Sequence, residues 1–188
     1  MVDLTKVTNF NRTQAELEEF WLVAICVAGK KGPVQAAKVE QFLAIQAGNT
    51  PFEKIQKMID KGVLLKHLKS VKIGQYKRIE KAFRESLNLD LKKSTLENFM
   101  KIPGVGNKTA RFFLLHTRKG CEHVVLDTHI LRYLRDECDL KNIPRSTPTN
   151  KKQYAEIETV ARDIIRAKFP KYSMADADLK IWRTMSGN

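Results

Sequence analysis

The sequence predicts an all-α protein with two helical lobes. Apolar residues recur at helical spacing along most of the 188 residues, and start signals with glycine or proline breaks divide them into segments of helix length. Only one short apolar run, residues 124–126, has the composition of a strand, and an isolated strand cannot build a sheet. We expect one helical lobe over residues 13–115 and a second formed by residues 1–12 together with residues 116–188.

Start signals define the helices of the first lobe. Thr13 and Glu16 form a capping-box pattern before a strongly apolar run. Pro33 suits the first turn of the next helix, and Thr50 followed by Pro51 combines a cap with a proline at the first helical position. Glycine breaks separate the later segments. The expected helices are residues 13–28, 33–45, 50–60, 63–69 and 74–87.

A glycine-punctuated turn joins two helices near the middle of the chain. The pattern from Ser94 to Glu97 is a capping box that opens one helix, and residues 107–115 form the next. Between them, Pro103 to Gly106 form a tight turn that needs the backbone freedom of glycine. Backbone N–H groups of the turn and of the second helix point outward and bind phosphate oxygens. The motif, residues 94–115, is expected to contact the phosphates of a ligand through Pro103, Gly104, Val105, Gly106, Asn107 and Thr109.

The C-terminal part continues the helical pattern. Asp127 is placed to cap a helix that reaches about Cys138. Pro144 and Pro148 then bracket a polar loop, and two more helices, about residues 150–167 and 173–186, complete the second lobe.

The chain is strongly basic. Its 34 Lys and Arg residues outnumber 21 Asp and Glu residues, which gives a net charge of +13. Such a surface attracts an acidic polymer and binds it through counterion release, so nucleic acid is the first candidate partner; a solvated basic surface or an anionic membrane are the alternatives. No stretch is long and apolar enough to span a bilayer, and residues 1–11 lack a signal-peptide core. We expect a soluble, intracellular monomer.

The cysteines do not indicate a metal site or a disulfide framework. Cys26, Cys121 and Cys138 are widely spaced, and their number is odd. We expect Cys26 to pack inside an apolar helix, and no cofactor.

One segment resembles a known enzyme family. Residues 102–110 read Ile-Pro-Gly-Val-Gly-Asn-Lys-Thr-Ala, and Asp127 follows Lys108 by nineteen residues within Leu-Asp-Thr-His-Ile. This combination resembles the signature of the helix-hairpin-helix DNA glycosylases, which include endonuclease III, the adenine glycosylase of mismatch repair and the 8-oxoguanine glycosylases. Residues 68–77 and 22–29 are similar to further family segments. The four-cysteine iron–sulfur segment of the endonuclease III branch is missing, which favours the cluster-free branches that act on oxidised purines.

The resemblance implies two catalytic residues. Lys108 would attack C1′ of an extruded nucleotide and form a Schiff base, which permits strand cleavage by β-elimination. A nucleophilic lysine must be neutral, and the positive end of a helix dipole disfavours an ammonium in the first turn. Asp127 would stabilise positive charge developing on the sugar. The alternatives are a Lys108 that only contacts phosphate and an Asp127 that only caps its helix.

The residues that contact the base are less sharply defined by the sequence. Asp178 and Trp182 lie one helical turn apart and resemble an acidic–aromatic pair that contacts the base in archaeal 8-oxoguanine glycosylases. A buried Trp182 with Asp178 as a surface charge is the alternative. Gln75, Tyr76 and Phe112 are further base-pocket candidates, and each is equally suited to a core position.

Two lysines and a group of backbone carbonyls complete the candidate site. The turn from Gly29 to Gly32 lies where endonuclease III-like enzymes carry a glutamine that fills the gap left by the flipped base, and Gly29 aligns with that glutamine. We therefore expect Lys30 and Lys31 on phosphates, with an ordinary basic loop as the alternative. By the same resemblance, the backbone carbonyls of Ile102 and Val105, and also that of Gly104, are candidates to hold a monovalent ion.

The sequence therefore predicts a base-excision-repair DNA glycosylase with abasic-site lyase activity. Its expected partner is double-stranded DNA containing a damaged base or an abasic site, with an oxidised purine such as 8-oxoguanine as the favoured substrate. The alternatives are an endonuclease III-like glycosylase for oxidised, deaminated or mismatched pyrimidines, and a non-enzymatic helix-hairpin-helix DNA-binding protein. The position of Asp127 argues against the last, because a simple hairpin binder has no use for that carboxylate.

Overall fold

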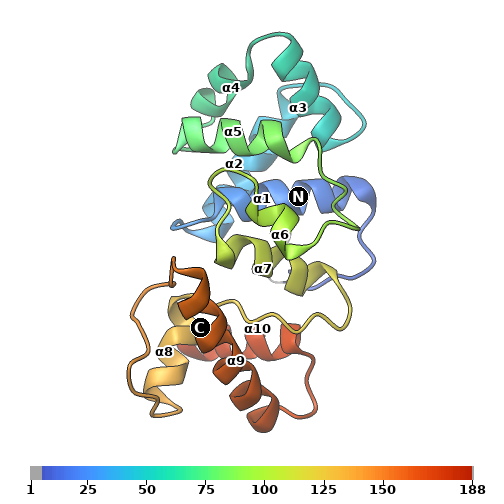
Figure 1. Ribbon diagram of the computed structural model, residues 1–188. Coiled ribbons are helices and arrows are strands. Elements are labelled where there is room, and N and C mark those ends of the chain that lie inside the picture. The colour runs from blue at the N-terminus through green and yellow to red at the C-terminus, as the bar shows by residue number, and fades with distance from the viewer. Residues whose placement is uncertain (1–5, 188) are drawn as a thin grey trace. The chain divides into compact units, whose positions relative to one another are not determined.

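The described chain is helical throughout. The computed structural model describes residues 6–187, and this range contains ten helices and no strand (Figure 1). The all-α prediction is confirmed for this range. Residues 1–5 and 188, which were assigned to the second lobe, lie outside the described residues. The chain divides into two compact units, residues 1–105 and 106–188.

The first unit is built around helix α1. Residues 20–26 of α1 are all buried, and α1 packs against α2, α3 and α5, as expected for a helix that is apolar on every side. Its Trp21 donates an indole hydrogen bond to Ser86 Oγ at 2.8 Å, and its ring lies 4.8 Å from that of Phe99. The helices of this unit are α1 (Gln14–Cys26), α2 (Gly32–Ala44), α3 (Pro51–Asp60), α4 (Leu64–Ser70), α5 (Tyr76–Ser86) and α6 (Leu96–Met100).

The second unit is organised by its last helix. Helix α10 (Met174–Ser186) packs against α7 (Asn107–Thr117), α8 (Thr128–Asp136) and α9 (Lys151–Lys168). Its core combines the apolar faces of these helices with the buried segment 124–126. This core fixes the positions from which α7 and α8 begin.

The hairpin helix α6 begins one residue later than expected. Its N-cap is Thr95, and the capping box uses Thr95 and Asn98 rather than Ser94 and Glu97. Ser94 donates its backbone N–H to the Asp90 carbonyl at 2.8 Å, which ties Ser94 into the preceding turn. The caps at Thr13 and Asp127 are as predicted.

Residues 124–126 are extended without forming a strand. Within the described range no other segment pairs with them; side chains bond to their backbone instead. The division into units falls between Val105 and Gly106, inside the hairpin, and so groups α7 with the second unit.

Candidate active site

Lys108 occupies the second position of helix α7. Gly106 is the N-cap of this helix in an extended conformation, and the first intrahelical hydrogen bond runs from Ala110 N to Gly106 O at 3.2 Å. Lys108 is half-buried. Its side chain therefore extends from the end of the helix where the dipole is positive and the backbone N–H groups lack intrahelical acceptors.

Asp127 caps helix α8 with one of its two carboxylate oxygens. Oδ1 accepts hydrogen bonds from the backbone N–H groups of His129 and Ile130, both at 2.9 Å. The cap fixes the orientation of the carboxylate and engages Oδ1 alone, so Oδ2 lies outside it. The capping role expected from the sequence is confirmed, and it leaves an oxygen for a second role.

Asp178 lies in the same electrostatic cluster. It is only 8% exposed, and its Oδ2 lies 3.5 Å from Nε2 of the fully buried His116. Burial raises the pKa of the Asp178 carboxyl, against the lowering effect of the His116 contact; the charge of Asp127 also raises this pKa and that of Lys108 lowers it. The charges of Lys108 and Asp127 therefore both act on the Asp178 carboxyl, within a single unit.

Aromatic residues flank this cluster. Phe112 is half-buried, with its ring edge-on to His116 at 4.8 Å. Trp182 is 41% exposed, and its ring lies 5.8 Å from that of His129. The alternative of a buried Trp182 with Asp178 as a surface charge is wrong, because it is Asp178 that turns inward to His116.

The hairpin turn exposes part of the expected phosphate-binding backbone. Gly104 has a φ of +81°, the left-handed conformation that favours glycine. Gly104 and Gly106 are exposed and Pro103 is half-buried. The other three expected contact residues are buried: Val105, Asn107 and Thr109.

Arg78 supports this turn from within the first unit. Its Nη1 donates to the Gly104 carbonyl at 2.8 Å, and its Nη2 donates to the Ile25 carbonyl at 2.9 Å. Gln75, in a left-handed conformation before α5, accepts from Arg78 Nε at 2.5 Å. Tyr76 is half-buried at the start of α5. Gln75 and Tyr76 therefore belong to the unit that does not carry Lys108.

The two lysines after α1 have different surroundings. Lys30 is half-buried and donates its ammonium to the Ile73 carbonyl at 2.5 Å, which ties the turn before α5 to the end of α1. Lys31 is exposed at the N-cap of α2. Lys31 is the lysine with the more open side chain for a phosphate contact.

The carbonyls of the hairpin differ in their capacity for a monovalent ion. The Gly104 carbonyl oxygen accepts a hydrogen bond from the Arg78 guanidinium, and the positive charge of this group disfavours binding of a cation at the same oxygen. The Ile102 oxygen accepts one hydrogen bond, from Val105 N at 3.0 Å, and a carbonyl oxygen has two lone pairs. Ile102 therefore fits an ion better than Gly104 does, and Val105 remains a candidate.

Cys26 has the packing role expected from the sequence. Its side chain is fully buried in α1, and burial raises the pKa of its thiol to about 12. Residues 6–187 contain no group of three His, Cys, Asp or Glu side chains that could hold a metal ion.

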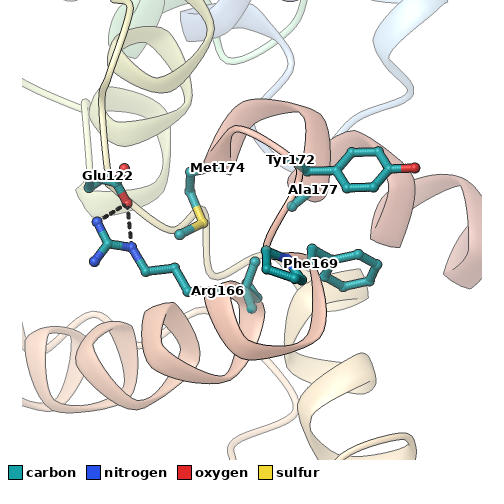
Figure 2. Close-up of a pocket in the computed structure, with 8 residues that line it drawn as sticks. Glu122, Arg166, Phe169, Tyr172, Met174 and Ala177 are labelled. Carbon is teal, nitrogen blue, oxygen red and sulfur yellow. Dashed lines mark hydrogen bonds and ion pairs between the residues drawn. The ribbon is translucent and has the colours of Figure 1, made fainter.

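A separate cavity lies elsewhere in the second unit. It has a volume of about 320 Å³ and is lined by Glu122 and by residues of α9, α10 and the loop between them, including Phe169 and Met174 (Figure 2). Arg166 Nη2 and Glu122 Oε2 form an ion pair at 2.9 Å beside it. None of the candidate catalytic residues lines this cavity.

Three contributors to the site were not found from the sequence. No local sequence motif predicts the contact of His116 with Asp178. No local motif predicts the hydrogen bond from Arg78 to the hairpin either. Glu158, the centre of a buried polar network in the second unit, had one weak signal: a lone acidic residue on the apolar face of its helix.

The helical fold with this hairpin is that of the helix-hairpin-helix DNA glycosylases. The sequence model of the family described as Ogg-HhH, 8-oxoguanine DNA glycosylase, matches residues 4–168. The chain belongs to this family, and its function is that of a base-excision-repair glycosylase acting on 8-oxoguanine. The preference for an oxidised purine over a pyrimidine is thereby confirmed.

A solved structure has the same fold. The 8-oxoguanine glycosylase/lyase of Methanocaldococcus jannaschii, in complex with a 15mer DNA containing 8-oxoguanine, is similar with a TM-score of 0.66 and 21% sequence identity. The similarity covers 98% of this chain and 89% of the other. No curated protein sequence matches the chain significantly. None of the helices described between residues 6 and 187 is long and apolar enough to cross a membrane.

Proposed function

We propose that this glycosylase is bifunctional, removing the damaged base and then cutting the DNA strand at the abasic site. Lys108 is the nucleophile and Asp127 is its electrostatic partner. The observation that supports this proposal is the cluster in the second unit, where Lys108 and Asp127 both act on the buried Asp178. A lysine that served only to contact phosphate would need no such pair of carboxylates.

The reaction begins when the neutral Nζ of Lys108 attacks C1′ of a flipped nucleotide. The bond from C1′ to the base breaks, and the base leaves with the electron pair and takes up a proton. Opening of the sugar ring gives a Schiff base between Nζ and C1′. Loss of a C2′ proton then expels the 3′ phosphate and nicks the strand, and water releases Lys108.

Asp127 acts on the positive charge that develops at the sugar. Because the helix cap uses Oδ1, Oδ2 is free of the cap to face the substrate while the carboxylate keeps a fixed direction. A preorganised charge of this kind costs no reorganisation during the reaction.

Asp178, Trp182 and Phe112 are proposed to contact the flipped base. The exposed face of Trp182 offers a stacking surface, and the buried carboxyl of Asp178 offers a directed hydrogen bond. Gln75 and Tyr76 remain candidates from the first unit.

The DNA backbone is proposed to bind at the hairpin N–H groups and at Lys31. The N-terminus of α7 and the exposed Gly104 and Gly106 supply donors for a phosphate. The partner is duplex DNA with a damaged base or an abasic site, the protein acts as a monomer, and the reaction needs no cofactor.

Borohydride trapping tests the nucleophile. The protein is incubated with a duplex that carries one 8-oxoguanine, borohydride is added, and the covalent adduct is measured on a denaturing gel. Lys108→Gln should abolish the adduct. Lys151→Gln, which removes an exposed charge at the start of α9, is the matched control and should retain it.

Three outcomes would contradict the proposal in different ways. An adduct that persists in Lys108→Gln would exclude Lys108 as the nucleophile. Excision without an adduct or a nick would mean a monofunctional enzyme. Excision that is confined to oxidised or deaminated pyrimidines in a panel of lesion duplexes would contradict the assignment of 8-oxoguanine as the substrate.

A further inference from the structure

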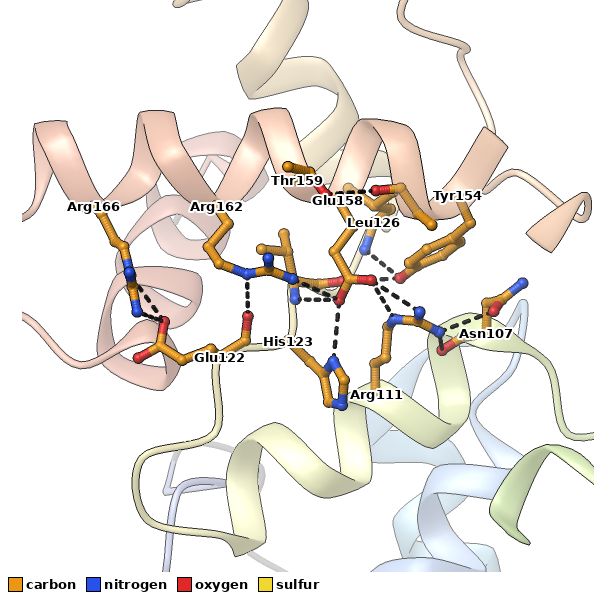
Figure 3. A network of polar contacts seen from close by, with 12 residues as sticks. Asn107, Arg111, Glu122, His123, Leu126, Tyr154, Glu158, Thr159, Arg162 and Arg166 are labelled. Carbon is orange, nitrogen blue, oxygen red and sulfur yellow. Dashed lines mark hydrogen bonds and ion pairs between the residues drawn. The ribbon is translucent and has the colours of Figure 1, made fainter. Parts of the chain in front are cut away.

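A buried polar network connects helix α9 to the residues that directly precede the two proposed catalytic residues, Asn107 and Leu126 (Figure 3). It begins at the extended segment that precedes Asp127. The Tyr154 hydroxyl accepts from Leu126 N and donates to the Val124 carbonyl, both at 2.9 Å. Glu158 Oε1 accepts from Val124 N at 3.1 Å. Side chains of α9 therefore supply the hydrogen bonds that a neighbouring strand would give in a sheet.

The last residue before Asp127 is held from two sides. Besides the bond from its N–H to Tyr154, the Leu126 carbonyl accepts from Thr147 Oγ1 at 2.8 Å. Asp127 N donates to the Val125 carbonyl at 2.6 Å, which closes a tight turn at the N-cap of α8. The direction in which the Asp127 carboxylate leaves the backbone is thus set largely by Tyr154 and Thr147.

A second arm of the network reaches the start of α7. Glu158 Oε2 accepts from Nε and Nη2 of Arg111, both at 2.9 Å. Arg111 Nη1 donates to Asn107 Oδ1 at 2.9 Å, and Asn107 directly precedes Lys108. This arm therefore fixes the first turn of the helix that carries the nucleophile.

The two arms meet on one face of α9. The Arg111 guanidinium lies 4.3 Å above the ring of Tyr154, and Tyr154 and Glu158 are one helical turn apart. The residues are nearly inaccessible to solvent: Tyr154 is 0% exposed, Glu158 4%, Arg111 6% and Asn107 8%. A buried network in which every charge is paired has few alternative arrangements.

We propose that Tyr154 and Glu158 are positioning residues that set the geometry of Lys108 relative to Asp127. Tyr154 acts through the backbone of residues 124–126, and Glu158 acts through Arg111. Neither residue needs to touch DNA. An attack on C1′ tolerates little misplacement, and a shift of about 1 Å costs on the order of a hundredfold in rate. The inference rests on the proposed function, because it assumes that Lys108 and Asp127 react.

Removal of one hydroxyl tests this inference. Tyr154→Phe keeps the ring against Arg111 and deletes both backbone bonds. Single-turnover excision of 8-oxoguanine should slow about 10- to 100-fold. The Kd for the lesion duplex, measured by anisotropy in a Lys108→Gln background that does not react, should change less than about threefold, because no DNA contact is lost.

Two controls separate positioning from a loss of structure. Tyr133→Phe removes the hydroxyl of another buried tyrosine of the same unit, one that contacts Cys138, and should leave the rate unchanged. With substrate in excess, the amplitude of the initial burst reports the folded fraction of the enzyme. Partial unfolding therefore lowers that amplitude and leaves the single-turnover rate constant unchanged. Should Tyr154→Phe fail to fold, Thr147→Val removes the bond to the Leu126 carbonyl with little change of shape, and should also slow the reaction at unchanged Kd.

The possible results distinguish this inference from the proposed function. A wild-type adduct that requires Lys108, combined with wild-type rates in Tyr154→Phe and Thr147→Val, would overturn the positioning role alone. A change in Kd with an unchanged rate would also overturn it. An adduct that does not need Lys108 would overturn the proposed function and the positioning role together.

Discussion

The buried ion pair between Arg111 and Glu158 should contribute far more to stability than its exposed counterpart in the same unit. Burial by itself raises the pKa of Glu158, but hydrogen bonds from His123 and Arg111 outweigh it and lower this pKa from 4.5 to about 2. A difference of one pH unit corresponds to about 1.4 kcal/mol. Glu158→Gln should therefore lower the free energy of unfolding by roughly 3 kcal/mol at neutral pH, which is within the usual cost of breaking a buried pair.

The matched control is Glu122→Gln. Glu122 and Arg166 approach to 2.9 Å, as Glu158 and Arg111 do, but their side chains are 43% and 59% exposed instead of 6% and 7%. An exposed pair typically contributes less than about 1 kcal/mol. Urea unfolding followed by circular dichroism measures both variants, and equal losses would refute the argument that burial makes the difference.

The pH dependence of the Glu158 effect has a definite sign. Because the folded-state pKa is lower than the unfolded value of 4.5, the contribution is fully present above about pH 4.5. It declines as the pH falls toward about 2. The difference between the wild type and Glu158→Gln should thus shrink as the pH falls from about 4.5 toward about 2. A difference that stays constant over this range would contradict the reasoning.

Three further predictions concern other parts of the chain. Gly104→Ala should destabilise by about 1–3 kcal/mol in thermal melts, because φ is +81° and a Cβ would lie 2.5 Å from Arg78 Cγ; Gly106→Ala, which has open space, is the control. In the native protein, Cys26 should not react with iodoacetamide at about pH 8, because burial raises the pKa of its thiol to about 12. Rapid labelling of Cys26 in mass spectra would contradict this. Burial raises the pKa of Asp178 above 3.8, so folding favours the protonated form of its carboxyl. As the pH rises above 3.8, the free energy of unfolding of Asp178→Asn should therefore increase relative to that of the wild type. A relative decrease in urea titrations would refute this prediction.

The parts of the fold that depend on local hydrogen bonds were predictable from the sequence. A capping box spans three residues, so Thr13 and Glu16 mark the start of α1 by themselves. The cap at Asp127 is equally local. The predicted start of α6 was wrong by one residue, because Ser94 donates its backbone N–H to the carbonyl of Asp90 in the preceding turn. The capping-box pattern alone does not reveal that hydrogen bond.

The parts of the site that depend on distant contacts were not predictable. Spacing alone places Asp178 and Trp182 on one helical face, but which of the two is buried depends on His116 in another helix. The segment before Asp127 has the composition of a strand, and only the tertiary structure reveals that Tyr154 and Glu158 supply its hydrogen bonds. Periodicity identifies a buried face but does not identify its partner.

The way in which α9 completes the backbone bonding of residues 124–126 limits how the reactive centre can be transplanted. A graft of the hairpin and the residues around Asp127 onto another scaffold would carry both reactive side chains. It would leave the Leu126 N–H without an acceptor and the Val124 carbonyl without a donor. Each unsatisfied buried group costs about 1–3 kcal/mol, enough for the loop to rearrange. A portable catalytic segment must therefore include α9 as well as α7 and α8, and a designer who wished to omit α9 would have to rebuild a hydroxyl and a carboxylate at the places of Tyr154 and Glu158.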